Sequence, residues 1–328
     1  MSKLIENPKT YAGKELDTIF FRPLLSGPDA TNLGIRVLYN MPVPTTLQFW
    51  KRAADVLKRY GKGWAGGDPA QKYQKKIELF KVKAELGFSA EDYFQMVYEE
   101  MAGSPEVNLD DLTGSALEAA ETALFKEAIA ESIRATMWVG DSSRADGLNT
   151  FDGLLKRIIA DADTAGAELK KVTMPAMAAA DAAEGLFKNM WEASPEVLRR
   201  FKNQGELVWL VTSDIFNNYE ESLDSITVES AYLAKQNGRK EIYYKGIPVV
   251  DVQVSGYLDG LAGMPKSFAL LTEKHNLALA VNTNDFPGME VRMWYNPDEM
   301  ENRQRAVFMA GCDYLLPELI VASFSALQ

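Results

Sequence analysis

Three observations in the sequence predict an α+β fold with a mixed sheet. The strongest helical pattern in the chain covers residues 115–139. Apolar, strand-like segments gather in the second half of the chain, and the longer ones lie toward its C-terminal end. Strand-like and helical segments do not alternate regularly, so repeated strand–helix units are not expected.

The first part of the chain is expected to be extended. Residues 1–39 hold three prolines and short apolar runs without a periodic face, which predicts an arm that packs on another surface. The segment 40–44 (NMPVP) then breaks the chain. Residues 76–86 alternate apolar and polar side chains, which predicts a strand.

Two helices are expected next. Ser89 is placed as the N-cap of a helix over 90–101, whose first residues are acidic and suit its positive end. Ser115 and Glu118 form a capping-box pattern that opens the helix over 115–139, a rod of roughly 36 Å. Its apolar residues form two adjoining stripes, Leu117, Ala120, Leu124 and Ala128, and beside them Phe125, Ile129, Ile133 and Met137.

The second half of the chain is expected to contain most of the sheet. The segments 242–244 and 247–252 flank a Lys-Gly pair, which predicts a hairpin or a kinked strand. Short helices are expected over 195–203 and 213–223. The other predicted strands are 206–212, 267–271, 277–282, 289–295, 305–310 and 319–324, with a polar turn around 296–303.

The composition bounds the class of protein. The chain has 328 residues, 47% of them hydrophobic, which suffices for a large core or for two lobes. Its net charge of −11 indicates that the molecule as a whole is not built to bind nucleic acid. The single cysteine excludes an internal disulfide and suits a reducing cytoplasm. No apolar run reaches the length of a membrane span.

Residues for catalysis are scarce. The only histidine, His275, is expected in a strand turn, and Cys312 is expected to be a small buried apolar residue. Gly61, Gly63 and Gly66 spell G-x-G-x-x-G, but a dinucleotide site needs a strand before the motif and a helix after it. A basic, helical pattern precedes these glycines and Gly-Asp-Pro follows them, so they are interpreted as a loop tip. No catalytic, cofactor or metal site is predicted.

Two blocks of opposite charge adjoin each other. Residues 51–83 hold ten basic and three acidic side chains, a net charge of +7. Residues 84–125 hold ten acidic side chains and no lysine or arginine, a net charge of −10. Three interpretations are open: two solvated faces, a nucleic-acid patch, or a basic segment that projects from the body onto the acidic surface of another copy.

We favour contact between copies. The basic segment carries few periodic apolar residues and would make a poor core by itself. The opposite charge of the next segment makes identical chains complementary to one another, and it argues against a DNA-binding module. The residues expected to make these contacts are Lys51, Arg52, Lys58, Arg59, Lys62, Trp64, Lys72, Lys75, Lys76, Glu91, Asp92, Glu99 and Glu100.

Four stretches, and their order along the chain, carry a resemblance to a known family. They are W-x-G-D…F-x-G within 136–153, Y-x-G-I-P-V at 244–249, the strand-Ser-helix passage at 207–219, and the closing strands at 289–324. Together with the arm, the basic segment and the long helix, they resemble the Hong Kong 97-type major capsid protein family of tailed bacteriophages. The resemblance covers nearly the whole chain.

The resemblance implies a division of the chain. It consists of an N-terminal arm (1–40), an extended loop (41–84), a peripheral domain (85–149 and 285–314) with a spine helix at 115–139, and an axial α/β domain (150–284 and 315–328).

The resemblance also implies a function. It is that of a structural, non-enzymatic subunit that assembles with itself into pentamers and hexamers of an icosahedral virion shell, in the cytoplasm of the host bacterium. The shell encloses double-stranded DNA without reading its sequence, and no cofactor or membrane is involved. Only about forty residues precede the extended loop, so either a separate scaffolding protein or an already trimmed design is expected, together with a portal. The alternative is an encapsulin-like nanocompartment shell.

Overall fold

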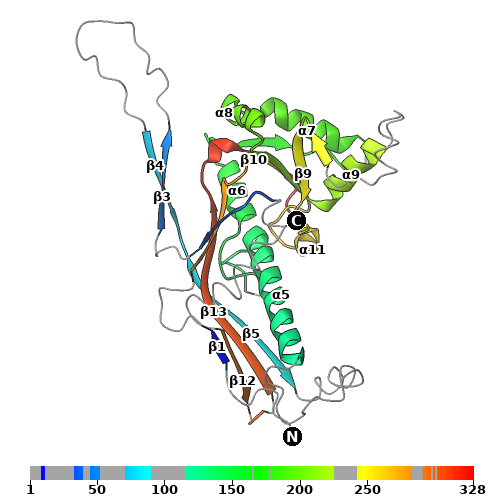
Figure 1. The fold of residues 1–328 in the computed structure, drawn as a ribbon. Coiled ribbons are helices and arrows are strands. Elements are labelled where there is room, and N and C mark those ends of the chain that lie inside the picture. Colours follow the sequence, from blue (N-terminus) through cyan, green and yellow to red (C-terminus); the bar gives the residue numbers. More distant parts are fainter. Residues whose placement is uncertain are drawn as a thin grey trace, which may run out of the picture.

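The chain folds into an elongated lower region and a compact lobe above it, as Figure 1 shows for a computed structural model. The long helix and the longest strands lie in the lower region, and the shorter helices cover the lobe. The structure describes residues 9–11, 33–39, 45–51, 71–89, 116–145, 147–164, 166–177, 179, 181–224, 242–282, 291–296, 298–299 and 301–328.

The lower region is built on a six-stranded mixed sheet around one long strand, β13 (Glu301–Tyr314). Strand β13 pairs antiparallel with three neighbours, and a parallel strand from the arm extends the sheet. The other strands are β1 (Lys9–Tyr11), β2 (Arg36–Tyr39), β5 (Phe80–Ser89), β11 (Leu277–Asn282) and β12 (Val291–Asn296). The predicted arm therefore contributes strands β1 and β2 to this sheet.

Helix α5 (Ala116–Val139) lies along this sheet, which confirms the predicted long helix. Phe125, Ile129 and Met137 of one predicted stripe are buried against the strands. Leu124 of the adjoining stripe is 46% exposed. Ala128 of the same stripe is half-buried and lines the space between α5 and the sheet, so the side of α5 that carries Phe125, Ile129 and Met137 is the one that faces the core.

The lobe is a second six-stranded mixed sheet with helices on both faces. Its strands, in spatial order, are β6 (Lys170–Thr173), β14 (Ile320–Phe324), β10 (Phe268–Glu273), β7 (Leu207–Val211), β9 (Ile247–Asp251) and β8 (Ile242–Tyr244). Its helices are α6 (Leu154–Ala162), α7 (Ala182–Ala193), α8 (Glu196–Arg200), η2 (Phe201–Gln204), α9 (Ser213–Asp224), α11 (Ser255–Leu258) and η3 (Pro317–Leu319).

The two faces of the lobe sheet belong to two cores. Trp209 of β7 packs with Phe187 of α7 and Tyr219 of α9 on one face. On the other face, the ring of Phe268 stacks on Trp138 of α5, with their centroids 5.6 Å apart. Every residue of β7 is buried, since helices cover both faces. One continuous core therefore joins the lobe to the long helix.

Most predicted elements of the second half are confirmed, with shifted ends. Strands β8 and β9 form the predicted hairpin. Strand β13 is longer than the predicted 305–310, because its polar first residues pair with both β12 and β5. His275 lies exposed in the turn between β10 and β11, as expected. The helix predicted over 90–101 lies outside the described residues.

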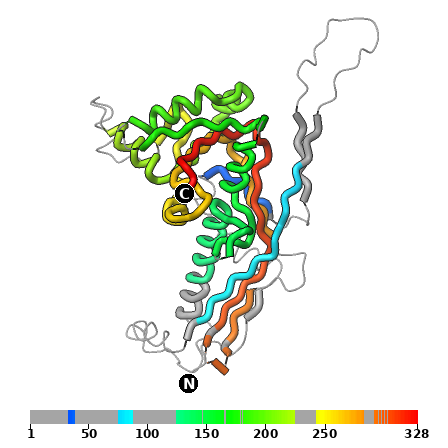
Figure 2. The backbone as a smooth tube through the Cα atoms, turned by 180° about the vertical axis from the view of Figure 1, so that it is seen from behind, coloured from blue at the N-terminus to red at the C-terminus, as the bar shows by residue number. Residues whose placement is uncertain are grey.

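The strand predicted over 76–86 is two strands. Strand β4 (Gln71–Ile77) ends just before β5 begins at Phe80. Strand β4 pairs with β3 (Thr45–Lys51) in a two-stranded sheet of its own, which we call the ribbon. Figure 2 shows β5 running along β13 and continuing past it toward the ribbon. The alternation of apolar residues persists through the break, because the chain passes from one partner strand to another without turning back.

Candidate functional site

The described residues do not assemble a catalytic centre from the few candidates in the sequence. Cys312 is fully buried in β13, and burial raises the pKa of its thiol to about 12, so it stays protonated near neutral pH. Among the described residues, no three His, Cys, Asp or Glu side chains are grouped as a metal site would require. No helix in the described part of the chain is long and apolar enough to cross a membrane.

The feature most relevant to function is the point where the ribbon leaves the rest of the described structure, which we call the body. Residues 75–79 pass over β13, and we call them the crossing segment. They comprise the last three residues of β4 and the two residues that connect it to β5. At Gly311 of β13 there is no room for a side chain, because a Cβ atom there would overlap the carbonyl oxygen of Glu78. A glycine inside an apolar strand can mark such a close approach of two backbones, and this signal was missed in the sequence.

Apolar contacts hold the crossing segment against the lower six-stranded sheet. Ile77 is fully buried and Leu79 is 9% exposed. Burial of each of these side chains contributes about 1.5–3 kcal/mol to stability. They form a small core of their own on β11 and β13, made of Ile77, Leu79, Ala278, Ala280, Met309 and Leu315.

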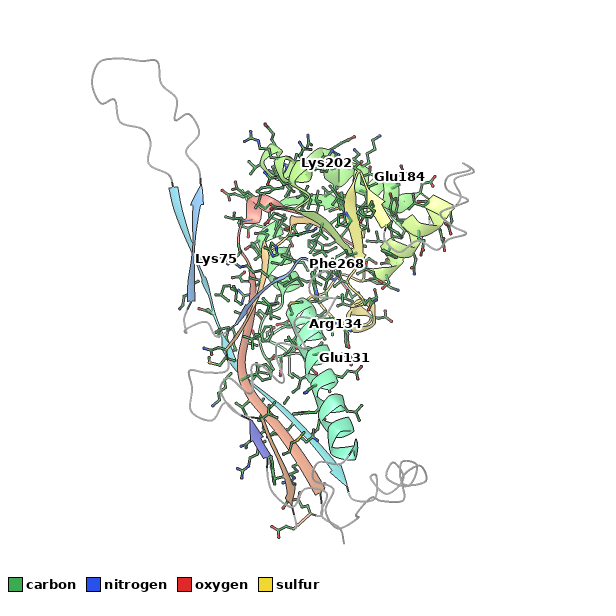
Figure 3. The ribbon with its side chains drawn as sticks, viewed as in Figure 1. Lys75, Glu131, Arg134, Glu184, Lys202 and Phe268 are labelled. Carbon is green, nitrogen blue, oxygen red and sulfur yellow. The ribbon has the colours of Figure 1, made fainter. Side chains whose placement is uncertain are left out.

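A buried carboxylate lies beside the crossing segment. The Asp313 side chain is 7% exposed, and its oxygens lie 3.0 Å from Lys75 Nζ and 3.6 Å from Arg157 Nη1. It also accepts a 2.9 Å hydrogen bond from the Tyr314 amide, and Lys75 Nζ lies 3.8 Å from the centroid of the Tyr314 ring. Burial raises the pKa of Asp313, and the two cations oppose that rise. Figure 3 shows Lys75 on the ribbon, beside the body.

A second backbone crossing lies at the end of α5. The Gly153 amide donates a 2.8 Å hydrogen bond to the carbonyl oxygen of Gly140. A Cβ atom on Gly153 would lie 2.7 Å from the Gly140 nitrogen and 2.9 Å from the Thr136 carbonyl oxygen. These glycines belong to the W-x-G-D…F-x-G passage of the resemblance. The passage is therefore a packing motif that fixes the long helix to α6.

Two carboxylates and a lysine close the loop after α5. Lys156 Nζ lies 2.6 Å from both Asp141 Oδ1 and Asp152 Oδ1. Ser143 donates to Asp141 through its amide and its hydroxyl. Hydrogen bonds from Lys156 and Ser143 hold the pKa of Asp141 well below its ordinary value. For Asp152, burial opposes ionisation, but hydrogen bonds from Lys156 and Ser142 outweigh it and lower the pKa.

This carboxylate pair predicts a loss of stability in acid. An aspartate whose pKa is lower in the folded than in the unfolded protein stabilises the fold at any pH above its unfolded-state pKa of about 4. This stabilisation is lost as the pH falls below about 4 toward the folded-state pKa. We expect Asp141→Asn to cost about 1–2 kcal/mol at pH 7 and to flatten the decline of the unfolding free energy below about pH 4. Urea unfolding across this pH range measures both effects.

The exposed Asp161 on α6 provides the control. Asp161→Asn should leave the stability at pH 7 and its acid dependence close to those of the parent protein. An Asp141→Asn protein with an unchanged acid profile would contradict the assignment.

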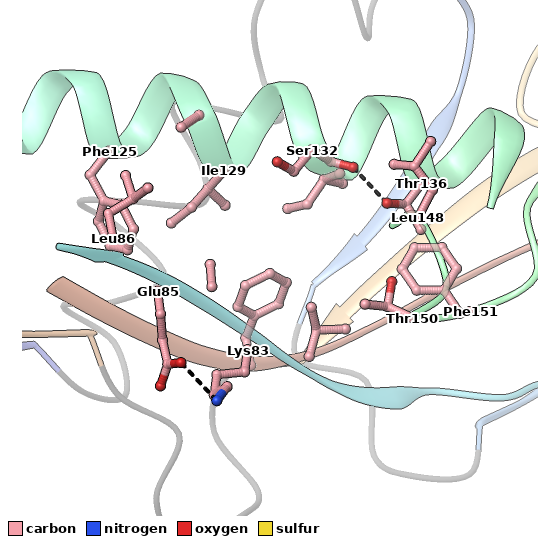
Figure 4. A pocket seen from close by; sticks show the side chains of 15 residues that line it. Lys83, Glu85, Leu86, Phe125, Ile129, Ser132, Thr136, Leu148, Thr150 and Phe151 are labelled. Carbon is pink, nitrogen blue, oxygen red and sulfur yellow. Dashed lines mark hydrogen bonds and ion pairs between the residues drawn. The ribbon is translucent and has the colours of Figure 1, made fainter. Parts of the chain in front are cut away.

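A cavity separates α5 from the sheet beneath it. It has a volume of about 340 Å³, and Figure 4 shows Phe125, Ile129 and Phe151 pointing into it. The Thr136 hydroxyl donates a 2.7 Å hydrogen bond to the Ser132 carbonyl oxygen within α5, which satisfies that polar group. The walls of the cavity are mainly apolar.

The structure places the predicted contact residues in different settings. Lys75 lies in the ion pair with Asp313 of its own chain. Lys76 is exposed and lies 3.8 Å from Glu78. Lys51 and Lys72 belong to the ribbon strands. The remaining predicted contacts lie outside the described residues, namely Arg52, Lys58, Arg59, Lys62, Trp64, Glu91, Asp92, Glu99 and Glu100. Contact between copies stays a prediction for the whole set.

Comparison with known proteins yields structural likeness only. No protein-family model matches the sequence, and no curated protein sequence matches it. The chain is similar to a chain of the satellite phage P4 procapsid that includes the size determination (Sid) protein, with a TM-score of 0.58 and 10% identity over 92% of this chain and 88% of that one.

Two further structures are similar over most of both chains. One is the capsid of an empty GTA particle, with a TM-score of 0.52 and 13% identity over 92% of this chain and 91% of that one. The other is from Mycobacterium phage Ogopogo, with a TM-score of 0.52 and 11% identity over 92% of each chain. At these identities the likeness establishes the fold.

Proposed function

We propose that this chain, which has the Hong Kong 97-type capsid fold, is the structural subunit of an icosahedral phage shell. In this role it assembles with itself into pentamers and hexamers that enclose double-stranded DNA. The observation that carries the proposal is the extent of the structural likeness. Capsid structures match about nine-tenths of this chain, and the match covers a similar share of their own chains.

The division of the chain into parts belongs to the same proposal. We assign an N-terminal arm to 1–40 and an extended loop to 41–84. We assign the peripheral domain to 85–149 and 285–314, and the axial domain to 150–284 and 315–328. The separation of the ribbon from both six-stranded sheets supports an extended loop within 41–84, whose last residues, from Phe80 on, pair with β13 of the lower sheet.

The extended loop is proposed to reach a neighbouring subunit. A two-stranded ribbon without a third partner strand is poorly stable alone in water. Contact with another copy would bury it, and its basic residues suit the acidic block at 84–125. Lys72 and Lys76 are the proposed electrostatic contacts within the described ribbon.

The proposed partners are those that a phage shell needs in order to assemble and to be filled with DNA. They are further copies of the chain, a separate scaffolding protein and a portal, with assembly in the cytoplasm of the host bacterium. The proposed role is structural and not enzymatic. An encapsulin-like shell is not favoured, because the similar solved structures include a satellite phage procapsid and the capsid of a GTA particle.

Negative-stain electron microscopy of the purified chain tests the proposal. We expect closed shells tens of nanometres wide, or rings of five and six subunits where the scaffolding protein is missing. A protein that stays monomeric at high concentration would overturn the shell proposal. Co-purified double-stranded DNA supports the phage-type shell, whereas a co-purified protein cargo supports the encapsulin-like alternative.

The same microscopy on a charge-reversed protein tests the loop contact. Lys72→Glu with Lys76→Glu should reduce assembly while the protein stays folded by circular dichroism. A matched control is Lys188→Glu on the exposed side of α7, outside the basic block. Normal particles from the doubly reversed protein would rule out the electrostatic contact.

A further inference from the structure

We propose that the buried Asp313 carboxylate sets the direction in which the ribbon leaves the body, by holding Lys75 of β4 and Arg157 of α6 at once. Lys75 is then a positioning residue within its own chain, in addition to any role in contacts between copies. The inference deepens the proposed function, since the ribbon is the part proposed to reach a neighbouring subunit.

The ribbon depends on its base for its direction. Strands β3 and β4 form a sheet of their own that is hydrogen-bonded to neither six-stranded sheet. Seven strand residues span roughly 23 Å. A rotation of about 10° at the base would therefore move the far end of the ribbon strands by roughly 4 Å. Such a displacement exceeds what a specific contact between subunits tolerates, so the base has to be fixed.

Apolar burial alone does not fix the angle. Ile77 and Leu79 hold the crossing segment down on the sheet, but hydrophobic attraction is non-directional. Lys75 adds direction, because its ammonium group lies both 3.0 Å from Asp313 Oδ1 and 3.8 Å from the centroid of the Tyr314 ring. Two anchors on β13 thus constrain one point of the ribbon.

The burial of Asp313 makes the loss of these partners costly. Its side chain is 7% exposed, and a buried carboxylate without partners is costly. Arg157 holds it from α6, and the Tyr314 amide holds the same oxygen that faces Lys75. The adjacent Lys76 differs, because it pairs with Glu78 at the surface, with both side chains more than half exposed. Such a pair contributes little, which makes Lys76 a matched control.

A distance measurement in solution tests the inference directly. Spin labels on cysteines introduced at Gln48 of β3 and at the exposed Asn189 of α7 report the ribbon direction by double electron–electron resonance, in the unassembled fraction of the full chain. The native Cys312 is fully buried, with its pKa raised to about 12, so it takes no label. The parent protein should give one narrow distance peak.

Lys75→Met should broaden this peak and reduce the assembly yield by about tenfold, since breaking one side of a buried ion pair is costly. Lys75→Arg should restore both, and Lys76→Met should leave the distance peak as narrow as in the parent protein. Asp313→Asn keeps the shape of the side chain and should broaden the peak as Lys75→Met does. It replaces Lys75→Met as the test if the Lys75→Met protein fails to fold.

An unchanged narrow peak in Lys75→Met or Asp313→Asn would overturn the inference, as would a broad peak in Lys75→Arg. The distance distribution needs no assembly. A parent protein that forms neither shells nor rings would therefore contradict the proposed function, while the peak widths still decide whether Lys75 and Asp313 position the ribbon.

Discussion

Gly311→Ala is expected to lower the free energy of unfolding by about 3 kcal/mol or more. The added Cβ atom would overlap the carbonyl oxygen of Glu78, which belongs to the backbone of the crossing segment. No side-chain rotation relieves such an overlap, so either β13 or the crossing segment has to move. Moving the crossing segment would lift Ile77 from its buried position.

Thermal and urea unfolding measure this effect, and a fall in Tm of roughly several degrees corresponds to it. Gly185→Ala in α7 is the matched control, because a Cβ atom there meets open space. Alanine favours a helix over glycine by about 0.5–1 kcal/mol, so this control should be slightly more stable than the parent protein. A Gly311→Ala protein as stable as the parent would show that the two backbones are not in contact.

Gly153→Ala is expected to have an effect of similar size, about 3 kcal/mol or more, at the other end of the long helix. Its Cβ atom would lie 2.7 Å from the Gly140 nitrogen, 2.9 Å from the Thr136 carbonyl oxygen and 2.9 Å from the Trp138 carbonyl carbon. All three atoms are backbone, so the chain after α5 would have to separate from the helix. That separation would also break the hydrogen bond between Gly153 and Gly140.

The loss should appear in the near-ultraviolet circular dichroism of Trp138 as well as in urea unfolding, because Trp138 is fully buried and stacks on Phe268. Gly147→Asn is the control in the neighbouring loop. Gly147 has φ +60° with open space around it, and asparagine tolerates that left-handed conformation. Equal stabilities of the Gly153→Ala and Gly147→Asn proteins would contradict the close crossing.

The stability of the two crossings bears on the proposed function. Gly311 lies under the crossing segment at the base of the ribbon, and Gly153 lies where α5 meets the lobe. Each allows two backbones to approach closely, which a rigid connection between extended parts requires. Subunits that must fit many neighbours in a shell gain from such fixed connections.

Local patterns predicted many of the regular elements, but not all of them. The helical pattern read before Gly61 was wrong at its start, where β3 is a strand, and helices α6 and α7 were not predicted. The capping box at Ser115 and the apolar stripe through Phe125 and Ile129 predicted α5, because a helix that packs on one side must repeat its apolar residues every three to four positions. Continuous apolar runs predicted β7 and β14, since both faces of the lobe sheet are covered. The order of the elements, together with the four stretches within 136–153, 207–219, 244–249 and 289–324, carried the resemblance to the capsid fold.

The sequence by itself determined the long helix α5 and the order of most strands in the second half of the chain, because burial periodicity is a local property of the chain. Only the tertiary structure decided which strand passes over which. The break in the predicted strand 76–86, the contact at Gly311 and the pairing of Lys75 with Asp313 all arise between residues distant in sequence. A charge count placed Lys75 in a basic block that faces outward, whereas the fold brings a buried carboxylate more than two hundred residues away within 3.0 Å of it.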